Sequence, residues 1–117
     1  MAFSTRWDDL PEVEVLPNNF RRSVAGHKLG INRIRLVHPS GTPVHRHEDE
    51  EQAVMIVSGE LDVTIAGQTI RMVPGDVCIV PAGTDHNFTT TAGETTLIEV
   101  FGPMRIQNLV GFLGKNF

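Results

Sequence analysis

The sequence contains a single cysteine, Cys78, and few clustered basic residues. One thiol excludes an internal disulfide and a cysteine-based zinc cluster, so any metal must be held by histidine and oxygen donors. The largest group of lysine and arginine is the pair Arg21 and Arg22, and the formal net charge is −4. This charge distribution argues against a nucleic-acid partner.

Long apolar runs are also missing. The longest uninterrupted one covers residues 53–57, which is far too short to span a membrane. Residues 1–9 carry charged side chains where a secretory signal would need an apolar stretch. We therefore expect a cytoplasmic protein without a membrane partner.

The patterns that are present indicate β-strands. Leu61, Val63 and Ile65 alternate with polar residues, which is the period of a half-buried strand. Glycine and proline divide the chain into short β-rich runs at residues 31–37, 44–47, 53–58, 61–65, 69–73, 77–80, 87–90 and 95–101. The pairs 58–59, 66–67 and 74–75 contain the turn residues that hairpins need. The predicted fold class is all-β, a sandwich or barrel.

The length of 117 residues suits one domain. We divide it into an N-terminal arm with edge strands (1–28), a barrel core (29–102) and a C-terminal tail (103–117). Residues 109–117 mix apolar side chains with two glycines. They are expected to form a short helix or strand that covers an apolar face, or part of a dimer contact.

Three histidines are candidate metal ligands. His45 and His47 are two residues apart in an expected strand, so their rings should share a face. His86 follows a proline–glycine turn at the start of another run. Inward positions of neighbouring strands converge in a small barrel, where imidazoles would suit divalent Mn, Fe, Ni, Zn, Co or Cu. The His45/His47 pair alone fits two solvated histidines equally well.

The residues around these histidines resemble the cupin superfamily. Its second motif, G-x5-P-x-G-x2-H-x3-N, runs from Gly75 through Pro81 and Gly83 to His86, with Thr90 replacing the asparagine. The first motif, G-x5-H-x-H-x(3,4)-E-x6-G, is also recognisable, although its leading glycine is displaced. The resemblance implies a single-domain double-stranded β-helix, or jelly-roll barrel, with a metal held by the three histidines.

The fourth ligand has two candidates. Six residues separate Gln52 from Gly59, as the motif requires, whereas Glu51 fits the shorter spacing after His47 but leaves seven. Similar cupins that carry an acid–glutamine pair here use the glutamine as ligand, so the resemblance favours Gln52 and leaves Glu51 as the alternative.

The segment Glu99-x-Phe101-x-Pro103-x-Arg105 looks like the end of the small cupins of pectin and alginate breakdown. The resemblance implies that Arg105 binds a sugar carboxylate, Glu99 transfers protons and Phe101 lines the pocket. This chain has glutamate at 99 where that group usually has aspartate. Glu99 and Phe101 share a strand face, which points either into the barrel or to solvent or a subunit interface.

Three functions are consistent with the sequence. The first is a metal-dependent isomerase or lyase on a small oxygenated substrate, such as one that ketonises unsaturated uronates. The second is a metal-dependent dioxygenase, and the third is a non-catalytic module that binds a sugar or another small molecule. Strand edges and apolar termini also lead us to expect a homodimer.

Overall fold

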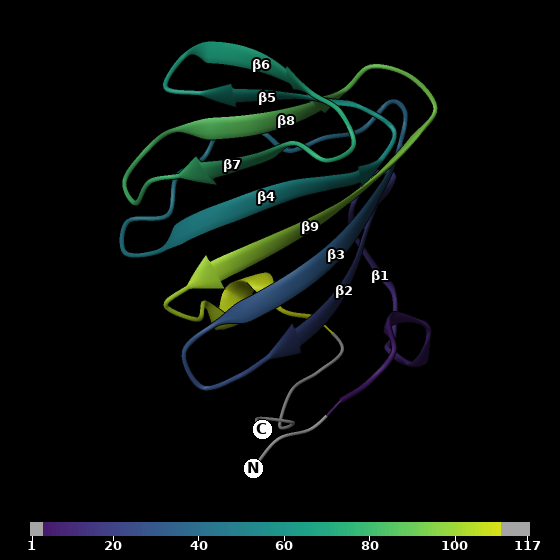
Figure 1. Cartoon of the computed structure of the whole chain (residues 1–117), viewed down its shortest axis with the longest axis vertical. Helices are drawn as coiled ribbons and strands as arrows, with labels where there is room; N and C mark the ends of the chain where they lie inside the picture. Colours follow the sequence, from purple (N-terminus) through teal and green to yellow (C-terminus); the bar gives the residue numbers. More distant parts are fainter. Residues whose placement is uncertain (1–3, 111–117) are drawn as a thin grey trace.

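The computed structural model describes residues 4–110 as a chain of short strands connected by turns (Figure 1). In chain order the elements are η1 (Trp7–Asp9), β1 (Val13–Leu16), β2 (Asn19–Ala25), β3 (Gly30–Val37), β4 (Glu51–Ser58), β5 (Leu61–Ile65), β6 (Gln68–Met72), β7 (Val77–Val80), β8 (His86–Thr90), β9 (Glu94–Gly102) and η2 (Ile106–Asn108), where η marks a 3₁₀ turn. The predicted all-β fold class is confirmed.

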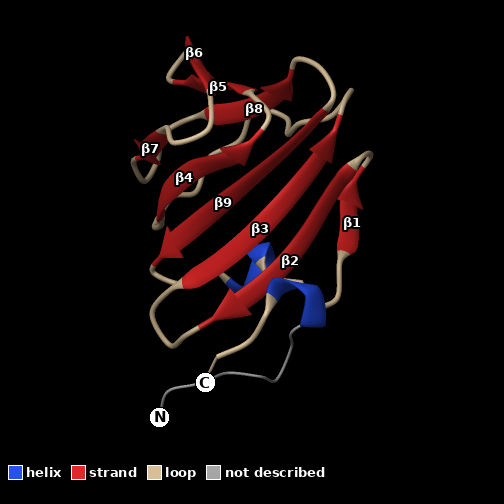
Figure 2. Ribbon diagram, turned by 45° about the vertical axis from the view of Figure 1, so that its right-hand side comes forward, coloured by secondary structure: helices blue, strands red, loops and turns tan. Residues whose placement is uncertain are grey.

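The strands form two antiparallel sheets. The larger sheet has the order β1-β2-β3-β9-β4-β7, and the smaller has the order β6-β5-β8. Figures 1 and 2 show the smaller sheet closing over one end of the larger one. The 3₁₀ turns η1 and η2, in contrast, lie at the opposite end of the larger sheet (Figures 1 and 2).

The core lies between the two sheets. Ile34 of β3, Val54 of β4 and Leu97 of β9 meet Val63 and Phe88 from the smaller sheet, and all five side chains are buried. Strand alternation produces this core, because every second residue of β3, β4 and β9 points inward. The same inward rows become polar toward one end of the barrel, and this polar end contains the predicted site.

The predicted turns have two different outcomes. Residues Ala66 and Gly67 form a two-residue hairpin loop between β5 and β6, and both have positive φ, as a type I′ turn requires. The pairs at 58–59 and 74–75 do not form hairpins, because each carries the chain from one sheet to the other. Gly59 is needed at its crossing: φ is +76°, and a Cβ there would lie 2.3 Å from the Glu94 carbonyl oxygen.

The strand expected at residues 44–47 is not formed. Only His45 pairs, through an isolated bridge to His86, while the rest of the segment follows an irregular path. At the N-terminal side, residues 1–28 contribute β1 and the complete strand β2, which pairs along the length of β3. The domain division and the homodimer stay predictions.

Only part of the C-terminal tail is described. Residues 106–108 form η2, which packs on β3. Of the helix or strand expected at 109–117, residues 111–117 lie outside the described range. Between residues 4 and 110, no helix has the length and apolar character needed to cross a membrane.

Candidate metal centre

The three histidines named from the sequence converge at the polar end of the barrel. His45 and His47 come from the irregular segment before β4, and His86 begins β8. Backbone hydrogen bonds in both directions between His45 and His86 (3.0 and 2.9 Å) tie the two segments together. The ring centroids lie 4.3 to 5.1 Å apart, and potential ligand atoms of the three side chains all lie within 4.8 Å of one another.

Backbone carbonyls set the orientation of two of these rings. The Nδ1 atom of His45 lies 2.7 Å from the Pro43 carbonyl oxygen, and that of His86 lies 2.9 Å from the Thr84 carbonyl oxygen. Because a carbonyl can only accept, Nδ1 must carry the hydrogen in both rings. The lone pair is then on Nε2, which is the arrangement that metal-binding histidines use.

Buried polar atoms without partners mark the same place. Among the described residues, Nε2 of His47, Nε2 of His86 and Oε1 of Gln52 are buried and lack a hydrogen-bond partner. Such atoms are costly to bury unless something satisfies them, and a cation is the partner that the lone pairs of His86 Nε2 and Gln52 Oε1 fit. The three-histidine cluster therefore fits a metal site.

The structure separates the two candidates for a fourth ligand. Gln52 is 2% exposed, lies on the inner face of β4 and pairs with Phe101 across the sheet. The Phe101 ring in turn meets the His47 ring edge-on, with centroids 5.0 Å apart. Glu51 is exposed on the opposite face of the strand. Gln52, and not Glu51, thus has its side chain inside the barrel.

Burial also adjusts the protonation of the candidate ligands. The pKa of His47 is lowered from 6.5 to about 4, mainly by burial and further by the neighbouring His45 and Arg105. Burial likewise lowers the pKa of His86, although its hydrogen bond to Thr84 acts in the opposite direction. Both rings are therefore neutral at pH 7, the form that binds metals.

Arg105 lies against His47. One of its guanidinium nitrogens donates to Nδ1 of that ring, which places the hydrogen of the neutral imidazole on Nε2. For His47 to ligate through Nε2 like the other two, this hydrogen must move to Nδ1 and Arg105 must give way. The structure thus brings Arg105 to the predicted site, in contact with a ligand candidate.

Glu99 is buried inside the barrel, on the same face as Phe101, and is 2% exposed. Oε1 accepts a hydrogen bond of 3.0 Å from the Asn32 amide, and Oε2 accepts one from the Gln52 amide. Burial raises the pKa of Glu99, while the Arg21 guanidinium, 4.0 Å away, and the two amides act to lower it. Because Glu99 is buried inside the barrel, the alternative in which it faces solvent or a subunit interface is wrong.

Sequence reasoning missed two residues of this site, Asn32 and Arg21. Arg21 was given no role in the site, but its side chain is 13% exposed and lies beside Glu99. A signal existed for Asn32: it is a polar residue in the inward row of β3, between Gly30 and Ile34. An inward polar residue on an otherwise apolar strand face indicates a site.

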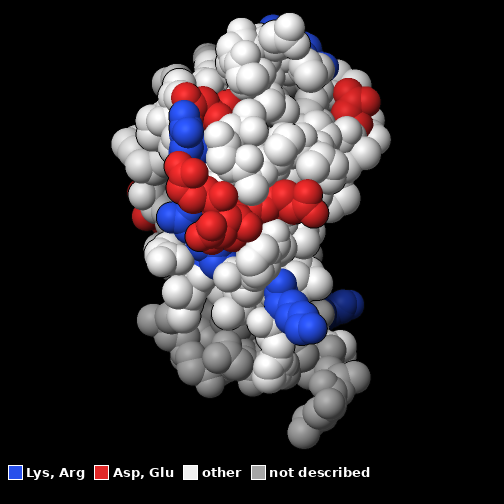
Figure 3. All heavy atoms as spheres, turned by 90° about the vertical axis from the view of Figure 1, so that its left-hand side faces the viewer, with Lys and Arg blue, Asp and Glu red and all other residues white. Residues whose placement is uncertain are grey.

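The acidic run at residues 48–51 lies mostly at the surface. Acidic side chains gather on the side of the molecule where β4 begins (Figure 3). Glu48, Asp49 and Glu51 are exposed, and Glu48 and Asp85 both lie within 4.0 Å of the Arg46 guanidinium. These carboxylates form a solvated rim, outside the histidine cluster.

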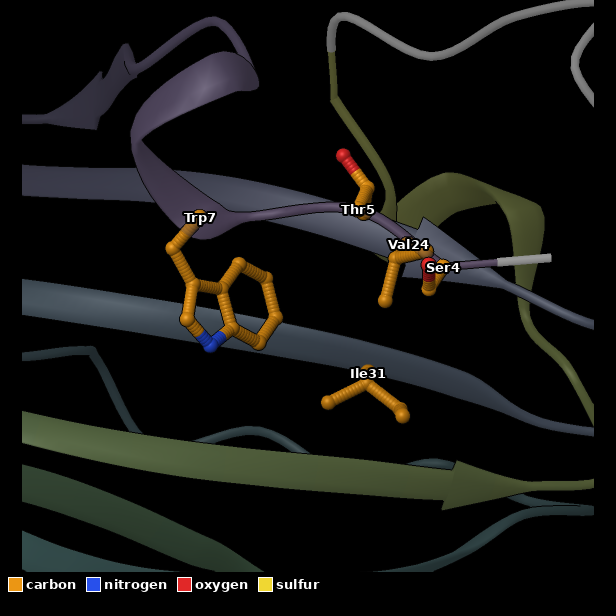
Figure 4. A pocket seen from close by; sticks show the side chains of 5 residues that line it. All are labelled: Ser4, Thr5, Trp7, Val24 and Ile31. Carbon is orange, nitrogen blue, oxygen red and sulfur yellow. The ribbon is translucent and has the colours of Figure 1, made fainter.

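A separate hollow lies on the outer face of the larger sheet. It measures about 340 Å³ and is lined by Ser4, Thr5, Trp7, Val24 and Ile31 (Figure 4). Val24 and Ile31 pair across β2 and β3 and point away from the barrel interior. This hollow has no part in the histidine cluster.

A two-sheet antiparallel barrel with three inward histidines at one end has the architecture of a cupin. The chain belongs to the cupin domain family, whose model matches residues 34–101. It is also 25% identical over 75 residues to a quercetin 2,3-dioxygenase of Bacillus subtilis, although it spans only 22% of that protein's length.

Solved structures show the same fold over nearly the whole chain. KdgF from Halomonas sp. superposes with a TM-score of 0.88 and 24% identity, covering 93% of this chain and all of that one. An RmlC-like cupin from Shewanella frigidimarina gives a TM-score of 0.84 and 22% identity, covering 92% of this chain and 96% of that one. The jelly-roll barrel implied by the sequence resemblance is thus confirmed.

Proposed function

We propose that this cupin is a metal-dependent enzyme of the isomerase or lyase type, acting on a small oxygenated carboxylate such as an unsaturated uronate. The observation that carries the proposal is the grouping, at one barrel end, of metal-binding donors with a buried acid and two arginines. His45, His47, His86 and Gln52 would hold a divalent transition metal, which supplies a Lewis acid that polarises a substrate oxygen.

The arginines favour an anionic substrate. Arg105 and Arg21 both reach the interior near Glu99 and His47. A guanidinium offers a planar fork of donors that matches a carboxylate, so either side chain can bind and orient a uronate acid group. In the metal-bound protein Arg105 has to leave His47, which frees its donors for the substrate.

Glu99 is the candidate group for proton transfer. Burial raises its pKa above that of a free glutamate, which is the direction that a general acid or base working near neutral pH needs. Phe101 covers the inner face beside His47, which limits water in the site. The similarity of residues 99–105 to the pectin and alginate cupins supports the same substrate class.

The test is turnover of 4,5-unsaturated monouronates by metal-loaded protein, followed as loss of their ultraviolet absorbance. Arg105→Met should reduce kcat/KM by about a hundredfold or more, as expected when a charge-assisted contact to the substrate is lost. Arg71→Met is the matched control, because Arg71 is an exposed arginine paired with Asp62 in the smaller sheet. Metal content is measured in parallel, because Arg105→Met also removes the contact to His47. A loss of bound metal would then be distinguished from a loss of substrate binding.

A dioxygenase is the second candidate, favoured by the match to quercetin 2,3-dioxygenase. Oxygen consumption with a flavonol, in the absence of any uronate turnover, would replace the first proposal with this one. No turnover in either assay by fully loaded protein would leave the non-catalytic binding module.

A further inference from the structure

A chain of hydrogen bonds leads from the C-terminal segment to Gln52, and each step has a defined direction. The backbone N–H of Val110 donates to the Ser23 hydroxyl oxygen at 2.9 Å. With its oxygen accepting there, the Ser23 hydroxyl donates to Oδ1 of Asn32 at 2.5 Å. This contact therefore places the carbonyl oxygen of the Asn32 amide toward Ser23.

A second contact fixes the other side of that amide. Nδ2 of Asn32 lies 2.8 Å from the Asn108 carbonyl oxygen, which can only accept. The amino group of Asn32 must face this carbonyl, and its other hydrogen points to Oε1 of Glu99 at 3.0 Å. The backbone of the C-terminal segment thus decides that Asn32 is a donor to Glu99.

Glu99 also fixes the direction of the Gln52 amide, because a carboxylate only accepts. Its second oxygen, Oε2, accepts from Nε2 of Gln52, so the amino half of the Gln52 amide is used on Glu99. Oε1 of Gln52 is left buried without a hydrogen-bond partner. Only this oxygen can ligate a metal, because the amide nitrogen has no available lone pair.

We propose that Glu99 is a positioning residue, whose carboxylate holds the Gln52 amide with its oxygen toward the metal. This inference rests on the metal site of the proposed function and gives Glu99 a role that proton transfer does not require. The reversed amide would place Oε1 of Gln52 against a carboxylate oxygen and turn its amino group to the metal. Removing one acceptor of Glu99 should therefore weaken metal binding.

The first variant is Glu99→Gln, which keeps the size of the side chain. The introduced amide still accepts from Asn32 through its oxygen, but its amino group then faces Gln52. Gln52 can satisfy that donor only with Oε1, so its own amino group turns toward the metal. We expect the affinity for Co²⁺ to fall about 10- to 100-fold, the usual effect of losing a group that orients a ligand.

The second variant, Glu99→Gln with Gln52→Glu, exchanges donor and acceptor between the two positions. The introduced amide donates to one oxygen of the introduced carboxylate and leaves the other oxygen free for the metal. Affinity should return to the parent level or exceed it. Glu51→Gln is the matched control: it removes one negative charge at the neighbouring, outward position and should change the affinity less than about threefold.

The readout is a Co²⁺ titration against a chromophoric chelator, together with the visible spectrum of the bound Co²⁺, which reports its ligand set. Unchanged affinity and spectrum in Glu99→Gln, or a double variant no better than the single one, would overturn the inference. If the single variant folds poorly, the double variant decides alone: parent-like affinity supports the role, and a loss of more than about tenfold refutes it.

The two proposals fail in different ways. A parent protein that binds no divalent metal refutes the proposed function. A parent that binds Co²⁺ and turns over uronates, beside a Glu99→Gln variant with unchanged affinity, refutes only the positioning role. If Glu99 also moves protons, the double variant will regain metal binding without regaining kcat.

Discussion

Replacing His47 should flatten the acid dependence of stability in the metal-free protein. The fold lowers the pKa of this ring from 6.5 to about 4, so folding favours its neutral form. Its contribution to stability is fully present above the pKa of the unfolded chain and is lost as the pH falls toward the folded value. With about 1.4 kcal/mol per unit of pKa shift, the loss between about pH 7.5 and pH 5 is roughly 2 kcal/mol.

The assay is urea unfolding of chelator-treated protein at a series of pH values, for the parent and for His47→Gln. The raised pKa of Glu99 acts in the opposite direction, because folding makes this carboxyl group harder to deprotonate, so its contribution to stability is lost as the pH rises. Both proteins contain Glu99, so the difference between their pH profiles isolates His47. His27→Gln, in the exposed turn between β2 and β3, is the control and should keep the parent profile.

Profiles of parent and His47→Gln that differ by less than about 0.5 kcal/mol across this range would refute the reasoning. Such a result would mean that the folded protein accommodates a charged imidazole in the cluster. The site would then be open enough to hydrate His47, contrary to its 6% exposure. Agreement would show instead that the fold keeps the His47 ring neutral in the metal-free protein.

Two further predictions test the ligand set and the core. Gln52→Leu should lower metal affinity at least tenfold in a competition titration, while Glu51→Leu changes it little, and the reverse result would restore Glu51 as the ligand. Leu97→Ala should lower the free energy of unfolding by about 3 kcal/mol, because Leu97 is fully buried between the sheets. Leu29→Ala, at an exposed position, should cost less than about 0.5 kcal/mol in the same urea experiment.

The polar end of the barrel combines neutral candidate ligands with one buried carboxyl group. Three imidazoles and an amide would leave a bound divalent ion with its full charge. Among the described residues, Glu99 is the only buried carboxylate, and Arg21 lies 4.0 Å from it. Glu99 thus lies beside the Arg21 guanidinium and orients the Gln52 amide. A substitution of Glu99 should therefore alter both interactions.

The sequence by itself determined the local features. Turn chemistry located the β5–β6 hairpin, because Gly67 adopts the positive φ that a two-residue loop needs without steric cost. Alternation placed Glu99 and Phe101 on one strand face, since the side-chain period of a strand is two. Histidine spacing then predicted the cluster, although the segment of His45 and His47 is not a strand.

Only the tertiary structure decided the contacts between distant parts of the chain. The pairs at 58–59 and 74–75 have the same turn residues as a hairpin, yet they cross between sheets, because strand pairing depends on residues far away in sequence. The orientation of the Gln52 amide likewise depends on Glu99, which is 47 positions away, and the orientation of the Asn32 amide depends on the carbonyl of Asn108. A hydrogen-bond direction is set by the partner on each side, and no local pattern contains those partners.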